Sequence, residues 1–477
     1  MADLDVQPIV NFSTGIICPG AVGESQIPLT AVSESVNLNF NTIGAVTLRK
    51  GVTAVGSGLP GSSLGLYEFR DSGTGTNNRL VAVSGTALYY LSAGTWTSKR
   101  SGLTALSPAR FTTFLDVLWM VNGTEATATW TGAVADSFIT TGIVANAPKG
   151  QYIDNFRNRV WIAGNPTYPD RLYYSSAVSG TPPTIEWTES DVLAGHFDIS
   201  PSDGDNITGI KRSKNTLLVF KRNHIYKVFS INETEPDPKI YVGTYSQESI
   251  VECMDTIYFH HPTGIYQLND SGLTKISDAV KDYLNAMPSS AYTDVCGWTD
   301  GTCIYESIGT VTTNGVTYTN AVLVYNIFTK AWTVSSYPSQ LYFSSNYDDG
   351  STLYHLTSGS SSSVLAMDTG NTDNGTPITY SLITRPYLFD GLFSTNKRIT
   401  KLSLIHNKME GGIFTYRADT DDVNKWTHIA QVGKSASIYK TDIKGNKIWF
   451  RFQGSSTGEQ FSLTGLEILK ITSELIG

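Results

Sequence analysis

Two adjacent histidines, His260 and His261, are the most conspicuous residues in this sequence with metal-binding or catalytic chemistry. They end the run DTIYFHH (255–261), and the turn signal PTG (262–264) follows them. In a strand, successive side chains point to opposite faces, so neighbouring histidines do not readily converge on one metal ion. We therefore expect a β-hairpin with structural histidines and predict no metal site.

Four aspartates could form the facing carboxyl pair that glycoside hydrolysis requires. They lie in turn-like contexts, where solvated aspartates are common. The sequence contains no HExxH zinc motif. We therefore predict no catalytic residue and no enzymatic activity. The four aspartates are Asp203, Asp205, Asp294 and Asp300.

Five basic residues surround a predicted hairpin at 215–229 and could contact nucleic-acid phosphates. Lys and Arg neutralise the charge of a phosphate backbone without reading its sequence. The alternative is a solvated sheet edge, since edge strands carry charges that prevent aggregation. The candidate DNA-phosphate contacts are Lys211, Arg212, Lys214, Lys221 and Arg222.

The segment GSGLPG (56–61) matches the GxGxxG pattern of dinucleotide-binding loops. Such a loop needs a strand before it and a helix after it, so that helix N–H groups meet the phosphates. Here a proline interrupts the loop and β-type sequence follows, so we predict no cofactor. The cysteines also lack CxxC zinc spacing, and we expect buried free thiols in a protein made in a reducing cytoplasm. They are Cys18, Cys253, Cys296 and Cys303.

The composition bounds the class of protein. The 477 residues carry a formal net charge of −8, and only 16% are charged, against a usual share of roughly a quarter. A basic nucleic-acid-binding surface over the whole protein is therefore excluded, although a local basic strip is not. The acidic start MADLDVQPIVNF does not resemble a signal peptide, and no apolar stretch is long enough to span a bilayer.

The hairpin around His260 has relatives along the chain, with an apolar strand, a turn and an aromatic second strand. Examples are 79–91, 159–175 and 215–229, and successive hairpins start roughly 35 to 55 residues apart, as in repeat architectures. Four-stranded blades of this kind bury their faces against neighbours in a ring. We therefore predict a β-propeller of six or seven blades over 61–375, the alternative being an irregular all-β domain.

The character of the sequence changes after the polar segment DTGNTDNGTP (368–377). Short strand candidates follow closely over 376–477 and favour a C-terminal antiparallel β-sandwich. Residues 1–60 are expected to be an N-terminal extended segment that packs on the β domains. The predicted fold is therefore all-β.

Two segments resemble the tail nozzle, or packaged-DNA stabilization, proteins of short-tailed bacteriophages (podoviruses). In 33–69 a V-N-L step (36–38) precedes a basic-Gly step, RKG (49–51), and a glycine-rich entry to the first blade. The second segment, 206–229, is similar to the family's central blade. The strands RITKLSLIH and FSLTGLEI resemble those of its terminal sandwich.

This resemblance implies a structural virion protein of the viral tail, synthesised in the host cytoplasm. As a homohexamer it would form the tail nozzle ring, retain packaged DNA and pass the genome at ejection. Implied partners are further copies of itself, tail adaptor proteins below the portal, and tail fibre, tailspike or needle proteins. Contact with genomic DNA would be transient and non-specific, with no membrane span. Aromatic residues of the sandwich are candidate subunit contacts, namely Tyr387, Phe389, Phe393, Trp426 and Trp449.

Two other functions remain open from the sequence. One is a β-propeller glycoside hydrolase with an accessory sandwich, and the other is a glycan- or receptor-binding tail module. A ring with a channel of duplex-DNA width would favour the nozzle. A deep axial pocket with paired carboxylates would favour the hydrolase.

Overall fold

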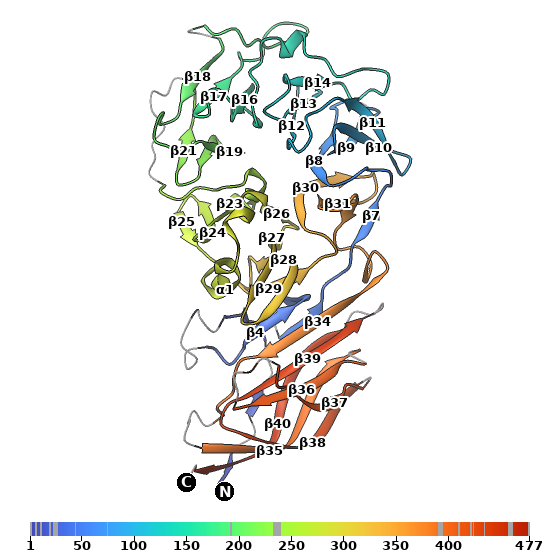
Figure 1. Cartoon of the computed structure of the whole chain (residues 1–477), viewed down its shortest axis with the longest axis vertical. Coiled ribbons are helices and arrows are strands. Elements are labelled where there is room, and N and C mark those ends of the chain that lie inside the picture. The colour runs from blue at the N-terminus through green and yellow to red at the C-terminus, as the bar shows by residue number, and fades with distance from the viewer. Residues whose placement is uncertain are drawn as a thin grey trace.

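Short antiparallel strands joined by tight turns make up most of the computed structural model (Figure 1). Among the described residues, the single α-helix is α1 (Lys281–Asn285), and none of the helices has the length and apolarity that a bilayer crossing requires. The structure describes residues 2–4, 7–9, 12–18, 21, 27–42, 44–73, 75–190, 193–231, 240–389, 395–408, 411–419, 422, 424–433, 435–456 and 461–475.

Six small antiparallel sheets and the antiparallel end of one larger sheet form the seven blades of a propeller in the described part of the chain (upper half of Figure 1). Blade 1 contains β8 (Ser63–Phe69), β9 (Arg79–Ser84), β10 (Ala87–Ser92) and β11 (Thr95–Ser101), and blade 2 contains β12 (Arg110–Phe114), β13 (Val117–Val121) and β14 (Ala128–Trp130). Blade 3 contains β15 (Tyr152–Phe156), β16 (Arg159–Ala163), β17 (Arg171–Tyr174) and β18 (Gly195–Asp198). Blade 4 contains β19 (Ile207–Ser213), β20 (Thr216–Lys221) and β21 (Ile225–Val228). Blade 5 contains β22 (Val251–Cys253), β23 (Thr256–His261), β24 (Gly264–Asn269) and β25 (Gly272–Lys275). Blade 6 contains β26 (Cys296–Thr299), β27 (Cys303–Thr313), β28 (Val316–Asn326) and β29 (Trp332–Ser336). Blade 7 contains β30 (Leu341–Asp348), β31 (Leu353–Gly359), β32 (Val364–Ala366) and β7 (Thr53–Val55).

The ring closes by pairing two distant parts of the chain. Strand β7 pairs antiparallel with β32, so blade 7 takes its fourth strand from the N-terminal segment. The innermost strand β30 of that blade packs against β8 of blade 1. The predicted all-β fold with a propeller of six or seven blades is therefore confirmed, with seven blades.

The first hairpin of several blades turns on two residues with positive φ. Leu115 and Asp116 have φ of 53° and 55°, and Arg157 and Asn158 have φ of 49° and 56°. Two successive left-handed residues match the twist of the flanking strands, and Asn and Asp tolerate this conformation well. These local turns explain why hairpins could be recognised in the sequence.

The C-terminal domain is the predicted β-sandwich, and its core is rich in phenylalanine. Buried Leu402 and Ile468 of one sheet share a core with Phe414, Phe450 and Phe452 of the other. The first sheet contains β38 (Ser435–Gly445), β35 (Thr395–Asn407), β40 (Ser462–Leu475), β6 (Ala45–Leu48) and β5 (Leu38–Thr42), with β1 (Ala2–Leu4) and β2 (Gln7–Ile9) also on β40. The second contains β4 (Ala31–Val36), β34 (Thr376–Thr384), β39 (Ile448–Ser456), β36 (Ile413–Ala418) and β37 (Thr427–Gln431), with β33 (Thr372–Asp373) on β34.

One continuous sheet joins the two domains. Strand β29 of blade 6 pairs in parallel with β4 and with β3 (Gly15–Ile16), and β4 pairs antiparallel with β34 of the sandwich. Residues 1–60 therefore supply strands to both sandwich sheets, to the junction and to blade 7. Because backbone hydrogen bonds run across the junction, the propeller and the sandwich are held in one orientation.

Candidate functional site

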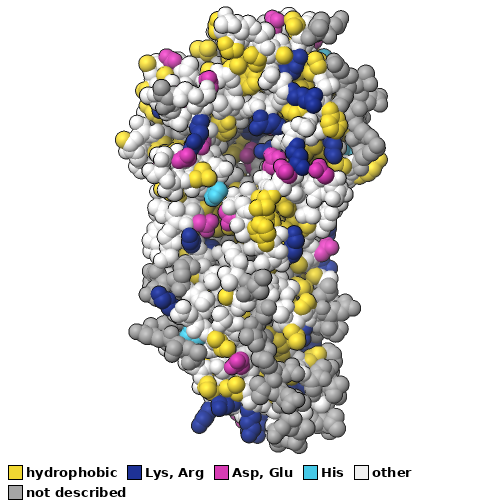
Figure 2. Space-filling model, turned by 180° about the vertical axis from the view of Figure 1, so that it is seen from behind, with side chains coloured by type: hydrophobic (Ala, Val, Ile, Leu, Met, Phe, Trp, Pro, Cys, Tyr) yellow, Lys and Arg dark blue, Asp and Glu magenta, His cyan; other side chains and the backbone are white. Residues whose placement is uncertain are grey.

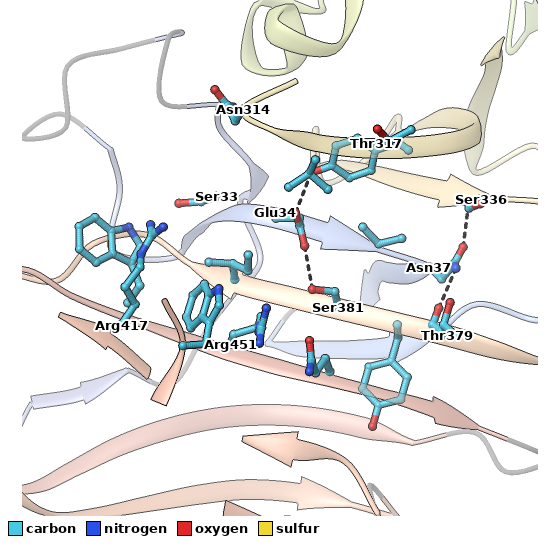
Figure 3. Close-up of a pocket in the computed structure, with 18 of the residues that line it drawn as sticks. Ser33, Glu34, Asn37, Asn314, Thr317, Ser336, Thr379, Ser381, Arg417 and Arg451 are labelled. Atoms are coloured by element: carbon cyan, nitrogen blue, oxygen red, sulfur yellow. Dashed lines mark hydrogen bonds between the residues drawn. The ribbon is translucent and has the colours of Figure 1, made fainter. Parts of the chain in front are cut away.

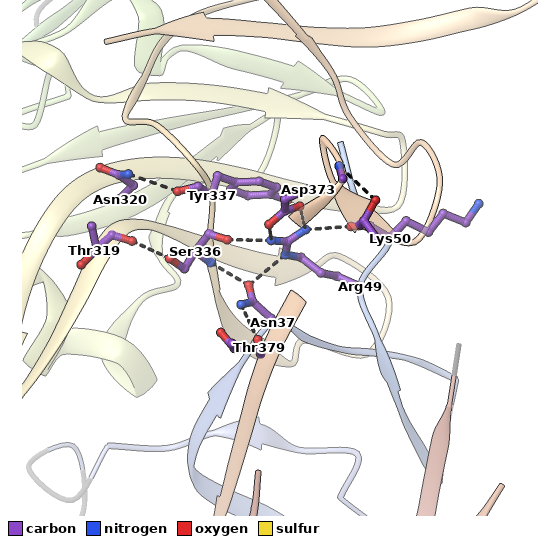
Figure 4. Close-up of polar contacts among 11 residues, drawn as sticks. Asn37, Arg49, Lys50, Thr319, Asn320, Ser336, Tyr337, Asp373 and Thr379 are labelled. Atoms are coloured by element: carbon purple, nitrogen blue, oxygen red, sulfur yellow. Dashed lines mark hydrogen bonds and ion pairs between the residues drawn. The ribbon is translucent and has the colours of Figure 1, made fainter. Parts of the chain in front are cut away.

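Arg49 is the centre of a buried polar cluster at the domain junction (Figure 4). Only 2% of its surface is exposed. Its two terminal nitrogens donate to the two carboxylate oxygens of Asp373, at 2.8 and 2.6 Å, and one also donates to the carbonyl of Ser336 at 2.7 Å. Its Nε donates to Oδ1 of Asn37 at 2.8 Å, and the guanidinium lies 4.4 Å from the ring centre of Tyr337. A bidentate pair of this kind combines strength with directional specificity.

Asn37 extends the Arg49 cluster into the sandwich. It has a positive φ of 59°, and its Nδ2 donates to the carbonyl of Thr379 on β34 at 2.7 Å. Its Oδ1 also accepts the backbone N–H of Ser336 at 2.8 Å. Next to Arg49, a Cβ at Gly51 would lie 1.9 Å from the carbonyl oxygen of Thr372, so only glycine fits there. The motif residues of 36–38 and 49–51 thus meet at one junction.

A cleft of about 810 Å³ lies beside this junction, between the β27–β28 hairpin of blade 6 and the sandwich strands β34, β36 and β39 (Figure 3). On one wall, Glu34 of β4 is 9% exposed and accepts hydrogen bonds from the hydroxyls of Tyr318 (2.6 Å) and Ser381 (2.7 Å). Hydroxyl and amide side chains also line the cleft, including Thr317, Thr319, Thr379, Asn424 and Gln453.

Two arginines and two tryptophans form the opposite part of the cleft wall. The Arg417 guanidinium lies 4.4 Å from the ring centre of Trp449 and 5.2 Å from that of Trp426. The Arg451 guanidinium lies 4.4 Å from the Trp426 ring. Burial lowers the pKa of Arg451, and the nearby charge of Arg417 lowers it further against the opposing effect of Glu34. The cleft therefore combines stacked guanidinium groups with one carboxylate.

Lys221 does not contribute to a basic surface. Its side chain is completely buried, and Nζ donates to both carboxylate oxygens of Asp203 at 2.9 Å, to Asp170 at 3.1 Å and to the carbonyl of Ser200 at 3.1 Å. The prediction of a DNA-phosphate contact at Lys221 is therefore wrong. The continuous apolar run 217–220 ends at Lys221, which ties blade 4 to the loop before it.

The other four predicted basic residues divide between two ends of blade 4. Lys211, Arg212 and Lys214 lie towards the β19–β20 turn, whereas Arg222 lies beyond the far end of β20, a six-residue strand. At about 3.3 Å per residue, these ends are roughly 20 Å apart. Lys214 forms ion pairs with Asp270 (3.0 Å) and Asp255 (3.8 Å) of blade 5.

Arg212 and Arg222 also have protein partners. Arg212 donates to Oδ1 of Asn155 at 2.8 Å, and the Arg222 guanidinium lies 5.5 Å from the ring centre of Tyr245. On the molecular face of Figure 2, the described Lys and Arg side chains over the propeller are interspersed with Asp and Glu and form no continuous basic strip. Contact of Lys211, Arg212, Lys214 and Arg222 with DNA stays a prediction.

The four candidate catalytic aspartates do not converge. Asp203 and Asp205 precede blade 4, whereas Asp294 and Asp300 belong to blade 6. Burial acts to raise the pKa of Asp203, but hydrogen bonds from Lys221 and from the N–H of Asp205 outweigh it and lower the pKa. Asp205 accepts the backbone N–H groups of residues 222 and 223, and Asp300 accepts those of residues 302 and 303. Three of the four thus stabilise turns or an ion pair.

His260 and His261 end strand β23 as expected, on opposite faces. His260 is 1% exposed, and burial, with a smaller effect of His261, lowers its pKa to about 3. Nδ1 of His261 lies 2.7 Å from the hydroxyl of Thr263 in the turn. Within the described ranges, no group of three or more His, Cys, Asp or Glu side chains is arranged to hold a metal ion. The four cysteines are buried and free, as predicted.

The cleft was not predicted from the sequence, although a signal for part of it exists. In KIWFRFQ (447–453), Trp449, Arg451 and Gln453 alternate with buried apolar residues, so they share the outer face of β39. Glu34 and Tyr318 come from distant segments with no such pattern. Among the predicted subunit contacts, Tyr387 and Trp449 are buried, at 1% and 5% exposure, and Phe393 lies outside the described residues.

No protein-family model and no curated protein sequence matches this chain. Among solved structures, the extracellular domain of a one-component system from B. thetaiotaomicron is similar over 86% of this chain, with 13% identity and a TM-score of 0.45. This chain covers 58% of that domain, less than two thirds of its length. YCF48 bound to a D1 peptide is similar over 67% of this chain and 95% of its own, with 11% identity and a TM-score of 0.40. These similarities concern the fold alone.

Proposed function

We propose that this protein is a structural subunit of the tail nozzle of a short-tailed bacteriophage. In this proposal, six copies form a ring in the virion tail that retains packaged DNA and conducts the genome at ejection. The main support is the continuous sheet through β29, β4 and β34, reinforced by the Arg49 cluster. A permanent conduit under load needs subunits whose domains do not swing relative to each other, and this junction provides that property.

Two further observations support a structural role. Asp203, Asp205 and Asp300 serve turns or an ion pair rather than a shared cavity. The net charge of −8 suits a surface that DNA passes without tight binding, because each neutralised phosphate adds favourable free energy from counterion release. The resemblance of residues 33–69 to tail nozzle proteins is the reason for proposing this particular assembly.

The test is the assembly state of the purified full chain and its location in the virion. We expect cryo-electron microscopy to reveal six copies around a channel of about 20 Å or more, wide enough for a DNA duplex. Immunogold labelling should place the chain in the tail below the portal. A monomer in the mature particle, or a location in the head shell, would contradict the proposal.

The hydrolase alternative has its own test. Purified protein is incubated with bacterial surface polysaccharides, and release of reducing ends is measured. The nozzle proposal expects no turnover. Turnover that Asp300→Asn or Asp203→Asn abolishes, in a variant that still melts like the parent chain, would support a propeller hydrolase instead.

A further inference from the structure

The cleft between blade 6 and the sandwich contains a cation, Arg451, that has no ion-pair partner among the described residues. Within the described ranges, its Nε donates only a long hydrogen bond to the Thr415 hydroxyl, at 3.3 Å. The side chain is half-buried, so its charge is only partly hydrated. Stacking against Trp426 fixes the plane of the guanidinium and leaves N–H groups at its edge for a planar anion.

The other wall favours hydroxyl groups as the neutral part of a ligand. Glu34 already accepts two protein hydroxyls, and a carboxylate has about four acceptor positions, so two remain for ligand O–H groups. Exposed hydroxyl and amide side chains line the same cleft at Thr317, Thr319, Thr379 and Asn424. The volume of about 810 Å³ lies within the range of small-molecule sites.

We propose that this cleft binds an acidic oligosaccharide. Arg451 pairs with a sugar carboxylate, while Glu34 and the neighbouring hydroxyl and amide groups bind the sugar hydroxyls. This proposal goes beyond the nozzle function, because it concerns a lateral cleft of each subunit rather than the channel of the ring. It gives the chain a site for uronic- or sialic-acid units of a glycan.

A single nucleic-acid strand fits the same cleft less well. Binding of single strands relies on aromatic rings on which bases stack, but two guanidinium groups already lie against Trp426, and Trp449 is 5% exposed. A phosphate at every nucleotide would also bring repeated negative charge towards Glu34. An isolated carboxylate beside Arg451, followed by neutral hydroxyls, meets neither obstacle.

The experiment uses the full chain and calorimetric titration with trigalacturonate, oligosialic acid and a hyaluronan hexasaccharide. Maltotriose is the neutral probe, and a dT₁₂ oligonucleotide is the nucleic-acid probe. We expect at least one acidic saccharide to bind, and maltotriose to bind at least about tenfold more weakly, because a charge-assisted hydrogen bond is lost. Arg451→Gln should weaken the acidic ligand about tenfold or more and leave maltotriose unchanged.

A matched control variant tests whether the loss of binding is specific to the cleft and does not follow from removing any arginine that stacks on an aromatic ring. Arg171 of blade 3 lies 4.0 Å from the ring centre of Tyr168, outside the cleft, and Arg171→Gln should leave saccharide binding unchanged. Both variants should keep the parent melting temperature within a few degrees. The proposal is overturned if none of the acidic saccharides binds, if Arg451→Gln has no effect, or if dT₁₂ binds more tightly than all of them in an Arg451-dependent way.

Discussion

Arg49 at the domain junction and Glu306 in blade 6 are both buried, and both are residues that usually carry a charge. Their surroundings differ. Arg49 donates to two carboxylate oxygens, an amide oxygen and two backbone carbonyls. Glu306 is completely buried, and among the described residues neither of its carboxyl oxygens has a hydrogen-bond partner. Burial raises the pKa of Glu306 well above its ordinary value, which favours the neutral carboxyl group.

His260 belongs to the same region as Glu306. Side-chain alternation places His260 on the face of β23 that carries Tyr258, and Glu306 on the face of β27 that carries Ile304. Tyr258 and Ile304 share one apolar core between blades 5 and 6. Nδ1 of His260 also has no hydrogen-bond partner within the part of the chain that the structure describes. The comparison shows that a buried charge joins distant segments where it is fully paired, whereas an unpaired ionisable group is kept neutral and makes stability depend on pH.

The largest expected effect is on the paired region. Arg49→Met removes the cation and leaves the Asp373 carboxylate, which is only 13% exposed, beside unpaired carbonyls. Breaking one partner of a buried pair ordinarily costs about 3–5 kcal/mol, so we expect a loss of that order in the free energy of unfolding, measured by urea denaturation. Arg171→Met, at a surface ion pair with Asp198, should cost far less, because such pairs contribute little to stability. Equal small losses in both variants would show that the Arg49 cluster does not hold the domains together.

The difference between the regions also explains what the sequence could predict. The blades could be predicted because each hairpin is formed by residues close together in the sequence. Asp116 and Asn158 mark two of the turns, and a strand lies on either side of each turn. The Arg49 cluster could not be predicted, because Asp373 lies 324 residues away in the sequence and no residue near Arg49 indicates that partner. The prediction for Lys221 failed for the same reason, since its partners Asp170 and Asp203 come from two separate loops earlier in the chain. The cleft needed β4, β34 and β39 to be brought together, and pairing of distant strands carries no local signal.

The second prediction tests how closely the segments at the junction must approach. Gly51→Ala would bring a Cβ within 1.9 Å of the Thr372 carbonyl, so strand β33 and the segment at 49–51 must separate. Overpacking of this kind costs about 3 kcal/mol, and we expect a lower melting temperature by differential scanning calorimetry. Gly61→Ala is the control, because a Cβ there meets nothing within 4 Å. Similar melting temperatures for both variants would mean that the junction tolerates separation.

The third prediction concerns the unpaired region and pH. The folded-state pKa of His260 is about 3, below its ordinary 6.5, so folding favours the neutral ring. Stability from this group is complete above pH 6.5 and is lost as the pH falls towards 3, which amounts to about 2 kcal/mol at pH 5. His260→Gln should therefore flatten the decline in unfolding free energy between pH 6.5 and 4. An unchanged acid profile would show that His260 is protonated in the folded protein.

Glu306 should make the unfolding free energy depend on pH in the opposite direction. Because its folded-state pKa is raised above the ordinary 4.5, stability is lost as the pH rises above 4.5. Glu306→Gln should stabilise the protein at pH 8 relative to the parent and have little effect at pH 4, measured by urea denaturation at both values. Glu189→Gln is the control: its side chain is 59% exposed and contacts His196 at the surface, where such pairs contribute little, so both values should change only slightly. Destabilisation at pH 8 would mean that an ionised Glu306 finds a partner.

The smallest expected effect concerns charges that are paired at the surface. Lys214 is exposed enough to exchange its carboxylate partners for a phosphate, whereas Lys221 is not, because its side chain has no exposed surface. If Lys214 contacts DNA in the channel, Lys214→Gln should weaken binding of a 20-base-pair duplex to the assembled protein equally for all sequences. It should also reduce the slope of log affinity against log salt concentration by about 1, since one fewer counterion is released. Lys401→Gln, at an exposed position of the sandwich strand β35, is the matched control and should leave the slope unchanged. The same slope for parent, Lys214→Gln and Lys401→Gln would show that the ion pairs of Lys214 with Asp255 and Asp270 join blades 4 and 5 and that this end of blade 4 does not meet DNA.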